Sequence, residues 1–83
     1  MALKIFLFSQ SGCLSCEITK ILLEAKGLDF EERDMTSDDA ARAELLEHYH
    51  SHTAPTLVIL TASGLEVIEG FDPDRLDRIL SAA

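Results

Sequence analysis

The order of hydrophobic and polar positions along the chain predicts four strands and three helices. Four segments are rich in β-favouring residues, and three others place apolar residues at helical spacing. The first strand is almost wholly apolar, which is typical of a central strand that is buried on both faces. The predicted strands are residues 3–8, 28–35, 56–60 and 65–68, and the predicted helices are residues 13–26, 39–50 and a terminal segment that begins at 73.

Turn and capping residues separate these segments. Gly27 follows the first helix as a C-terminal cap, and Asp72 followed by Pro73 is a typical start of the last helix. The segment Thr36-Ser37-Asp38-Asp39 offers N-caps for the second helix. The helix between the first two strands implies that they run in parallel, whereas the short turn at 62–64 implies an antiparallel hairpin. The sequence therefore predicts an α/β fold of order β-α-β-α-β-β-α, with a four-stranded mixed sheet and three helices.

Composition and charge restrict the class of protein. The chain has 83 residues, 47% of them hydrophobic, and this predicts one globular domain over residues 1–83. Its net charge of −8 argues against binding to nucleic acid or to an anionic membrane and favours basic protein surfaces as partners. The apolar start, residues 1–8, is too short for a signal peptide or a membrane span. We therefore expect a cytoplasmic protein.

The two cysteines lie in the segment SGCLSCE, directly after the first predicted strand. A helix start stabilises a thiolate, because its N–H groups lack intrahelical partners and the helix dipole is positive there. Cys13 and Cys16 are three residues apart, so their side chains lie on nearly the same face of the helix and a disulfide is within reach. A C-x-x-C pair at the start of a βαβ unit in a cytosolic chain predicts a redox dithiol.

Two other interpretations of the cysteines stay open at this point. Two buried, inert thiols are disfavoured, because a helix start is a poor place to bury both. A zinc site needs two further ligands, and His48, His50 and His52 are spaced so that a helix would splay them apart. No metal ligands are therefore assigned within the chain. An iron–sulfur cluster shared between two chains, or a binding module without turnover, remains an alternative function.

Two further segments carry candidate binding residues. Pro55 opens the third predicted strand, where its missing N–H costs no ladder hydrogen bond. Asp72 is a helix cap, and together with the helix start it can hold an amine or peptide group. Gly70 allows a ligand backbone to approach closely.

Together these segments resemble the glutaredoxins of the thioredoxin superfamily over nearly the whole chain. The resemblance is carried by the C-x-x-C pair, by Thr53-Ala54-Pro55-Thr56 before a strand, and by Gly70-Phe71-Asp72 before the last helix. It implies a thioredoxin fold, with Cys13 as the nucleophile and Cys16 as the resolving thiol. It also implies that Pro55 is cis and lies beside Cys13, and that the Ala54 backbone pairs with the substrate. The substrate-binding residues it implies are Thr53, Ala54, Pro55, Gly70, Phe71 and Asp72.

The chain departs from the common glutaredoxin pattern in ways that bear on its reductant. Cys13-Leu14-Ser15-Cys16 replaces Cys-Pro-Tyr-Cys, residues 9–11 contain no lysine or arginine, and Glu69 stands where a glycine is usual. The segment 70–76 resembles the glutaredoxin-like electron donors of ribonucleotide reductase, which thioredoxin reductase reduces. We expect a monomeric protein disulfide reductase without a tightly bound cofactor, with glutathione or thioredoxin reductase as electron source. Its expected partner is a disulfide-containing protein such as ribonucleotide reductase.

Overall fold

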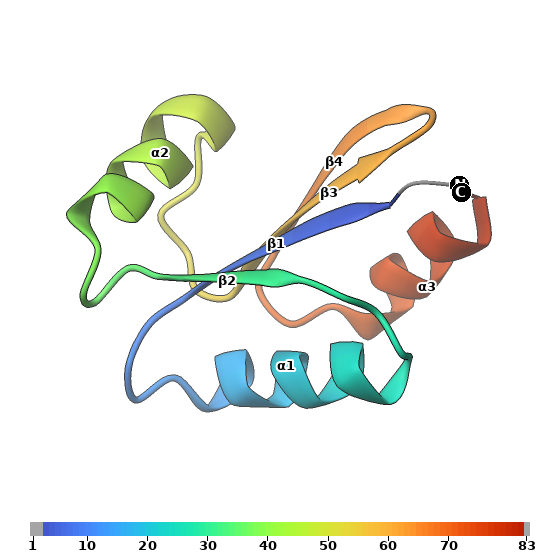
Figure 1. The fold of residues 1–83 in the computed structure, drawn as a ribbon, viewed down its shortest axis with the longest axis horizontal. Coiled ribbons are helices and arrows are strands. Elements are labelled where there is room, and N and C mark those ends of the chain that lie inside the picture. The colour runs from blue at the N-terminus through green and yellow to red at the C-terminus, as the bar shows by residue number, and fades with distance from the viewer. Residues whose placement is uncertain (1–2, 83) are drawn as a thin grey trace.

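The computed structural model describes residues 3–82, which form one sheet with helices on both faces (Figure 1). The order of elements is the predicted one. None of the helices in this part of the chain is long and apolar enough to cross a membrane. The elements are β1 (Lys4–Ser9), α1 (Leu14–Ala25), β2 (Glu31–Asp34), α2 (Asp39–Tyr49), β3 (Thr56–Thr61), β4 (Gly64–Glu69) and α3 (Pro73–Ala82).

The sheet has the strand order β2-β1-β3-β4, which places the most apolar strand, β1, in its interior. β1 pairs in parallel with β2 and antiparallel with β3, and β3 pairs antiparallel with β4. The predicted α/β fold with a mixed four-stranded sheet and three helices is therefore confirmed. Phe6, Leu7 and Phe8 pair with strands on both sides, so the end of β1 that leads to the cysteines is held at both edges.

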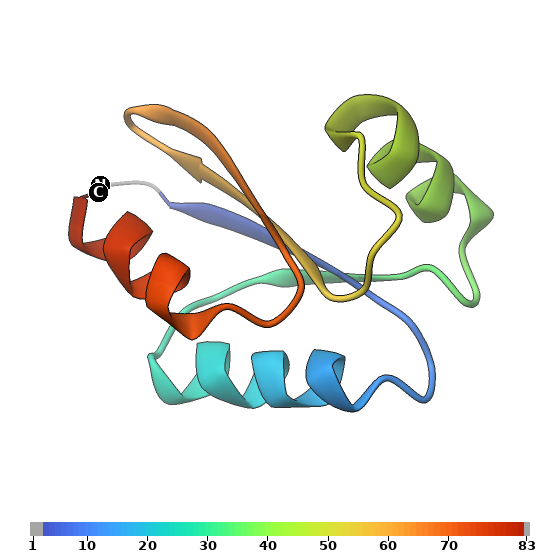
Figure 2. The same cartoon turned by 180° about the vertical axis from the view of Figure 1, so that it is seen from behind.

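Two layers of helices cover the sheet. α1 and α3 lie together on one face, and α2 lies on the other (Figures 1 and 2). Alternate residues along each strand point to opposite faces, so the buried residues divide into two clusters. The α1–α3 cluster contains Ile5, Leu7, Leu23, Leu57, Ile59, Ile68 and Leu76. The α2 cluster contains Phe8, Met35, Ala41, Leu45 and Val58.

The helix ends have the caps that the sequence predicted. The Asp72 carboxylate accepts a hydrogen bond of 3.1 Å from the Arg75 backbone N–H at the start of α3. At the start of α2, Asp38 accepts one of 3.2 Å from the N–H of Ala41. Gly27 follows α1 with φ 70°, a left-handed conformation that glycine adopts without strain.

Two details differ from the sequence prediction. β2 covers only Glu31–Asp34 rather than residues 28–35, because pairing with β1 begins at the partners Phe6 and Glu31. α1 begins at Leu14, so that Cys13 is its cap rather than part of its first turn. The side chains of Leu28 and Phe30, which precede β2, still pack against the α1–α3 cluster.

Candidate functional site

Three loops meet at one end of the sheet. In the strand register, Phe8 near the end of β1 pairs with Thr56 at the start of β3, and Thr56 pairs with Glu69 at the end of β4. The loop that follows β1, the loop that precedes β3 and the loop that follows β4 therefore begin or end side by side. These loops carry the candidate residues, so the topology brings Cys13, the Thr53–Pro55 segment and the Gly70–Asp72 segment to one edge of the molecule.

The loop from β1 to Cys13 is held by residues at the end of β2. The Ser11 N–H donates to Thr36 Oγ1 over 2.8 Å, and the Thr36 N–H donates to Asp34 Oδ1 over 2.9 Å. The chain then turns at Gly12, whose φ of 73° favours glycine. No local sequence pattern marks the contact of Thr36 with Ser11, since it spans 25 residues. These contacts hold the loop that leads from β1 to Cys13.

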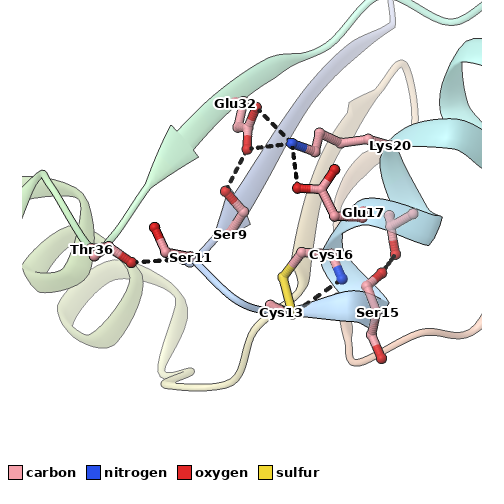
Figure 3. Close-up of polar contacts among 10 residues, drawn as sticks. Ser9, Ser11, Cys13, Ser15, Cys16, Glu17, Lys20, Glu32 and Thr36 are labelled. Atoms are coloured by element: carbon pink, nitrogen blue, oxygen red, sulfur yellow. Dashed lines mark hydrogen bonds and ion pairs between the residues drawn. A yellow bond between two sulfur atoms is a disulfide. The ribbon is translucent and has the colours of Figure 1, made fainter.

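The two cysteines form a disulfide at the start of α1, with a Cα–Cα distance of 5.2 Å (Figure 3). Cys13 caps the helix, because its Sγ accepts a hydrogen bond of 3.1 Å from the Cys16 N–H. Cys16 is only 1% exposed, whereas Cys13 is partly exposed. An incoming thiol or disulfide therefore reaches the sulfur of Cys13 more readily than that of Cys16.

The electrostatic support for a Cys13 thiolate comes from the helix start. The sequence has no lysine or arginine between Lys4 and Lys20, and the nearest acidic side chain on the helix is Glu17 in its first turn. Backbone N–H groups at the start of α1, including that of Cys16, stabilise negative charge on Sγ. These groups are fixed by the helix and therefore need no rearrangement when the thiolate forms.

A polar network lies next to the disulfide and joins α1 to β2 and β1 (Figure 3). The Lys20 ammonium contacts Glu17 at 3.1 Å and Glu32 at 3.2 Å. The Ser9 hydroxyl at the end of β1 donates to Glu32 Oε2 over 2.7 Å. Hydrogen bonds to Glu17 and then to Glu32 raise the pKa of Lys20, because both favour its charged form. Lys20 is thus occupied by two carboxylates, and this network carries a net negative charge.

The raised pKa of Lys20 predicts a dependence of stability on pH. Since the folded-state pKa lies above the unfolded value of about 10.4, the stabilisation is complete below that pH and is lost as pH rises through the folded-state pKa. We expect Lys20→Met to lower the free energy of unfolding at neutral pH by about 0.2–1 kcal/mol. In denaturant titrations this difference should shrink in strong alkali, and Lys20→Arg should abolish the alkaline loss. A constant difference across the alkaline range would contradict the prediction.

The loop before β3 is held by buried hydroxyl groups. The Ala54–Pro55 peptide bond is cis, as the resemblance to glutaredoxins implied. Thr56 Oγ1 donates to the Thr53 carbonyl and contacts Ser51 Oγ at 3.1 Å. The Thr53 N–H donates in turn to Ser51 Oγ over 3.3 Å. Ser51 and Thr56 are both buried, so this loop is fixed from beneath while its residues 53 and 54 stay partly accessible.

A main-chain hydrogen bond joins the second and third loops. The Gly70 N–H donates to the Pro55 carbonyl over 2.8 Å. Pro55 itself is buried, Gly70 is partly buried, and Phe71 and Asp72 are exposed. The Asp72 carboxylate is engaged as the cap of α3. No sequence motif marks Ser51, a common hydroxyl residue whose contacts with Thr53 and Thr56 form within the loop itself.

A disulfide at the start of the helix in a β-α-β unit, at the same edge of the sheet as a cis-proline loop, is typical of thiol–disulfide oxidoreductases of the thioredoxin fold. Residues 5–61 match the Glutaredoxin family, and the chain belongs to that family. Within residues 3–82, no group of three or more His, Cys, Asp or Glu side chains is arranged to hold a metal ion.

The relatives of the chain agree with this assignment. It is 30% identical over 73 residues to the Gene 56 protein of Mycobacterium phage L5, and the match covers 88% of this chain and 68% of the relative. Its structure is similar to that of the thioredoxin-like protein BC3987, with a TM-score of 0.80, 36% identity and coverage of 90% and 97% of the two chains. It is also similar to the glutaredoxin-like protein NrdH-redoxin from Escherichia coli, with a TM-score of 0.71, 28% identity and coverage of 92% and 93%.

Proposed function

We propose that the protein reduces disulfides in partner proteins by exchange at Cys13. The Cys13 thiolate attacks one sulfur of the substrate disulfide, which forms a mixed disulfide and releases the other substrate sulfur as a thiolate that takes up a proton. The Cys16 thiol, after losing its proton, attacks Cys13 Sγ, releases the second substrate thiol and leaves the Cys13–Cys16 disulfide. Two electrons pass to the substrate in each cycle, and an external dithiol or two molecules of glutathione restore them.

The difference in accessibility between the two cysteines is the observation that carries this proposal. Cys13 is partly exposed at the helix cap and Cys16 is buried one turn further on, 5.2 Å away between Cα atoms. The accessible sulfur suits the exchange with an external partner, and the buried sulfur suits the internal resolving step. No tightly bound cofactor is needed for either step.

The loops next to Cys13 supply the proposed substrate site. We assign to the Ala54 backbone a β-type pairing with an extended substrate segment, flanked by Thr53 and Pro55. The Gly70–Asp72 segment bounds the other side, and its hydrogen bond to the Pro55 carbonyl supports a common groove. The candidate substrate is a cytoplasmic protein disulfide such as that of ribonucleotide reductase, a proposal supported by the segment 70–76.

The electron source is proposed to be a thioredoxin reductase rather than glutathione. Glutathione carries a net negative charge, whereas this chain has a net charge of −8, Glu69 at the end of β4 and Lys20 already paired with two carboxylates. NrdH-redoxin, a glutaredoxin-like protein with a thioredoxin-like activity profile, adds support by its likeness. We expect faster NADPH-coupled turnover with thioredoxin reductase than with glutathione and glutathione reductase, and a reductase rate that falls as salt rises.

A lysine before the dithiol should shift this preference toward glutathione. Gln10 is exposed in the loop after β1, so Gln10→Lys adds a cation on the approach to Cys13. One such ion pair contributes about 1–4 kcal/mol near a surface, and about 1.4 kcal/mol is a tenfold change in affinity. We therefore expect a lower KM for glutathione in the coupled assay, and no change for Gln10→Met. Efficient turnover of the unmodified protein with glutathione, without thioredoxin reductase activity, would refute the proposed electron source.

A further inference from the structure

The outward face of α1 carries three large apolar side chains in a line. Leu14, Ile18 and Ile21 are 74%, 40% and 63% exposed. They are spaced four and three residues apart, so they lie on one face of the helix and extend over about 10 Å along its axis. We call these three residues the α1 stripe. It begins with Leu14, between the two cysteines, and runs away from them along the helix.

The α1 stripe lies on the other side of the helix from the residues that α1 buries. α1 buries Cys16, Thr19 and Leu23 on its opposite side. Single exposed apolar residues are common on protein surfaces and need no explanation, whereas an aligned group of them marks an interaction surface. This group adjoins the accessible sulfur of Cys13, where the proposed function places the partner protein.

The charges along the α1 stripe indicate the kind of partner. Glu17 and Glu24 are both exposed and lie seven residues apart along one border of the stripe. Lys20, the basic residue nearest to Glu17 on the helix, is shared between Glu17 and Glu32. A second copy of this chain, with its net charge of −8, would bring like charges together across such a contact. The surface therefore fits a partner with apolar side chains bordered by lysine or arginine.

We propose that the α1 stripe and its acidic border, Glu17 and Glu24, form the docking surface for the partner protein that exchanges its disulfide at Cys13. This inference rests on the proposed function and adds the chemistry of the partner: apolar side chains flanked by basic ones, near the reactive cysteine. The stripe lengthens the contact beyond the Thr53–Pro55 loop, along α1. Basic residues on the partner accelerate its approach, and apolar burial on the stripe holds it while exchange proceeds.

Three short synthetic peptides of equal length test the proposal. Each carries one cysteine as a mixed disulfide with thionitrobenzoate, so that attack by the reduced protein releases a coloured thiolate. The first peptide has leucines and lysines near the cysteine, the second has leucines and glutamates, and the third has serines and lysines. We expect the leucine–lysine peptide to react about tenfold faster than either of the others, an advantage that declines as salt rises.

Variants of the stripe give the second arm. Each variant's rate with a peptide is divided by its rate with 2-hydroxyethyl disulfide, which is too small to contact the α1 stripe. Ile21→Ser should lower the relative rate for the leucine–lysine peptide by about fivefold to tenfold. Glu24→Lys leaves the acidic border without net charge, so it should remove most of the preference for the leucine–lysine peptide over the leucine–glutamate peptide. Leu46→Ser is the matched control, because Leu46 is a similarly exposed apolar residue on a different helix, α2. It should leave every rate unchanged.

Docking is also measured without chemistry. Peptides with serine in place of cysteine are titrated into the protein, and we expect the leucine–lysine peptide to shift the amide resonances of Leu14–Ala25. Equal rates for the three peptides, an unchanged preference in Ile21→Ser, or the absence of such shifts would each overturn the docking surface. If the protein instead fails to reduce 2-hydroxyethyl disulfide while the shifts on α1 are present, the proposed oxidoreductase function fails and the docking surface stands.

Discussion

Replacement of Cys13 by serine is expected to lower the rate of disulfide reduction to the rate seen without protein. The structure places the sulfur of Cys13 at the accessible cap of α1 and buries that of Cys16, so no second thiol is positioned to replace the nucleophile. A hydroxyl in its place is almost wholly protonated at neutral pH and is a far weaker nucleophile than a thiolate. The measurement is turnover of 2-hydroxyethyl disulfide with a chemical dithiol as reductant, which needs no knowledge of the natural partner.

Cys16→Ser is the matched control for this prediction, because it removes only the resolving step. This variant should still attack a disulfide once and then accumulate the mixed disulfide at Cys13, visible as a covalent adduct by mass spectrometry. Alkylation of the reduced protein gives an independent check, since Cys13 should react first at neutral pH. If Cys16 is alkylated faster, or if the adduct forms on Cys16 in Cys13→Ser, the assignment of the two roles is wrong.

Among the substitutions considered, Leu23→Ala is expected to cause the largest decrease in the free energy of unfolding. Leu23 is fully buried and joins α1 to the α1–α3 cluster under the sheet. Truncation of a buried leucine costs about 2–5 kcal/mol, against a total of about 5–15 kcal/mol for a whole domain. We therefore expect a large decrease in the denaturant midpoint, and loss of the fixed position of the dithiol at the start of the same helix.

Ile21→Ala provides the control on the same helix. Ile21 is of similar size but lies on the exposed face of α1, at 63% exposure. Its truncation should change the free energy of unfolding by about 0.5 kcal/mol or less. Equal losses for the two variants would mean that the α1 face assigned to the core is incorrect. The pair also separates stability from docking, because only the exposed residue belongs to the α1 stripe.

Much of the fold follows from local patterns, and the differences occur where local patterns conflict with packing. The order of elements was predicted correctly from local signals. These are the apolar run of β1, the caps at Asp38 and Asp72, and the turn at residues 62–64. In α1, by contrast, two apolar residues at helical spacing, Ile18 and Ile21, are exposed. The face of α1 that packs on the sheet is the one that carries Leu23, and it includes the polar residue Thr19. The spacing of apolar residues alone does not identify this face, because Thr19 is polar.

The candidate site was predictable to the extent that it lies in short motifs. The C-x-x-C pair and the cis bond at Pro55 follow from segments of a few residues together with the resemblance to glutaredoxins. The groups that hold the chain just before the C-x-x-C pair were not predictable, because they act across long stretches of chain. Ser9 meets Glu32 across 23 residues and Ser11 meets Thr36 across 25. Common hydroxyl residues of this kind gain their roles only when β1 and β2 pair.

The capping of α1 by Cys13 sets a conflict between robustness and reactivity at a single atom. Sulfur is a weak hydrogen-bond acceptor, whereas the oxygens of serine and aspartate are among the best acceptors for a helix start. A sequence optimised only for a stable helix would therefore place serine or aspartate at this position, and the protein would then lack its nucleophile. Selection for thermal endurance alone would tend to remove the nucleophile, so extra stability has to be gained elsewhere, at residues that take no part in exchange.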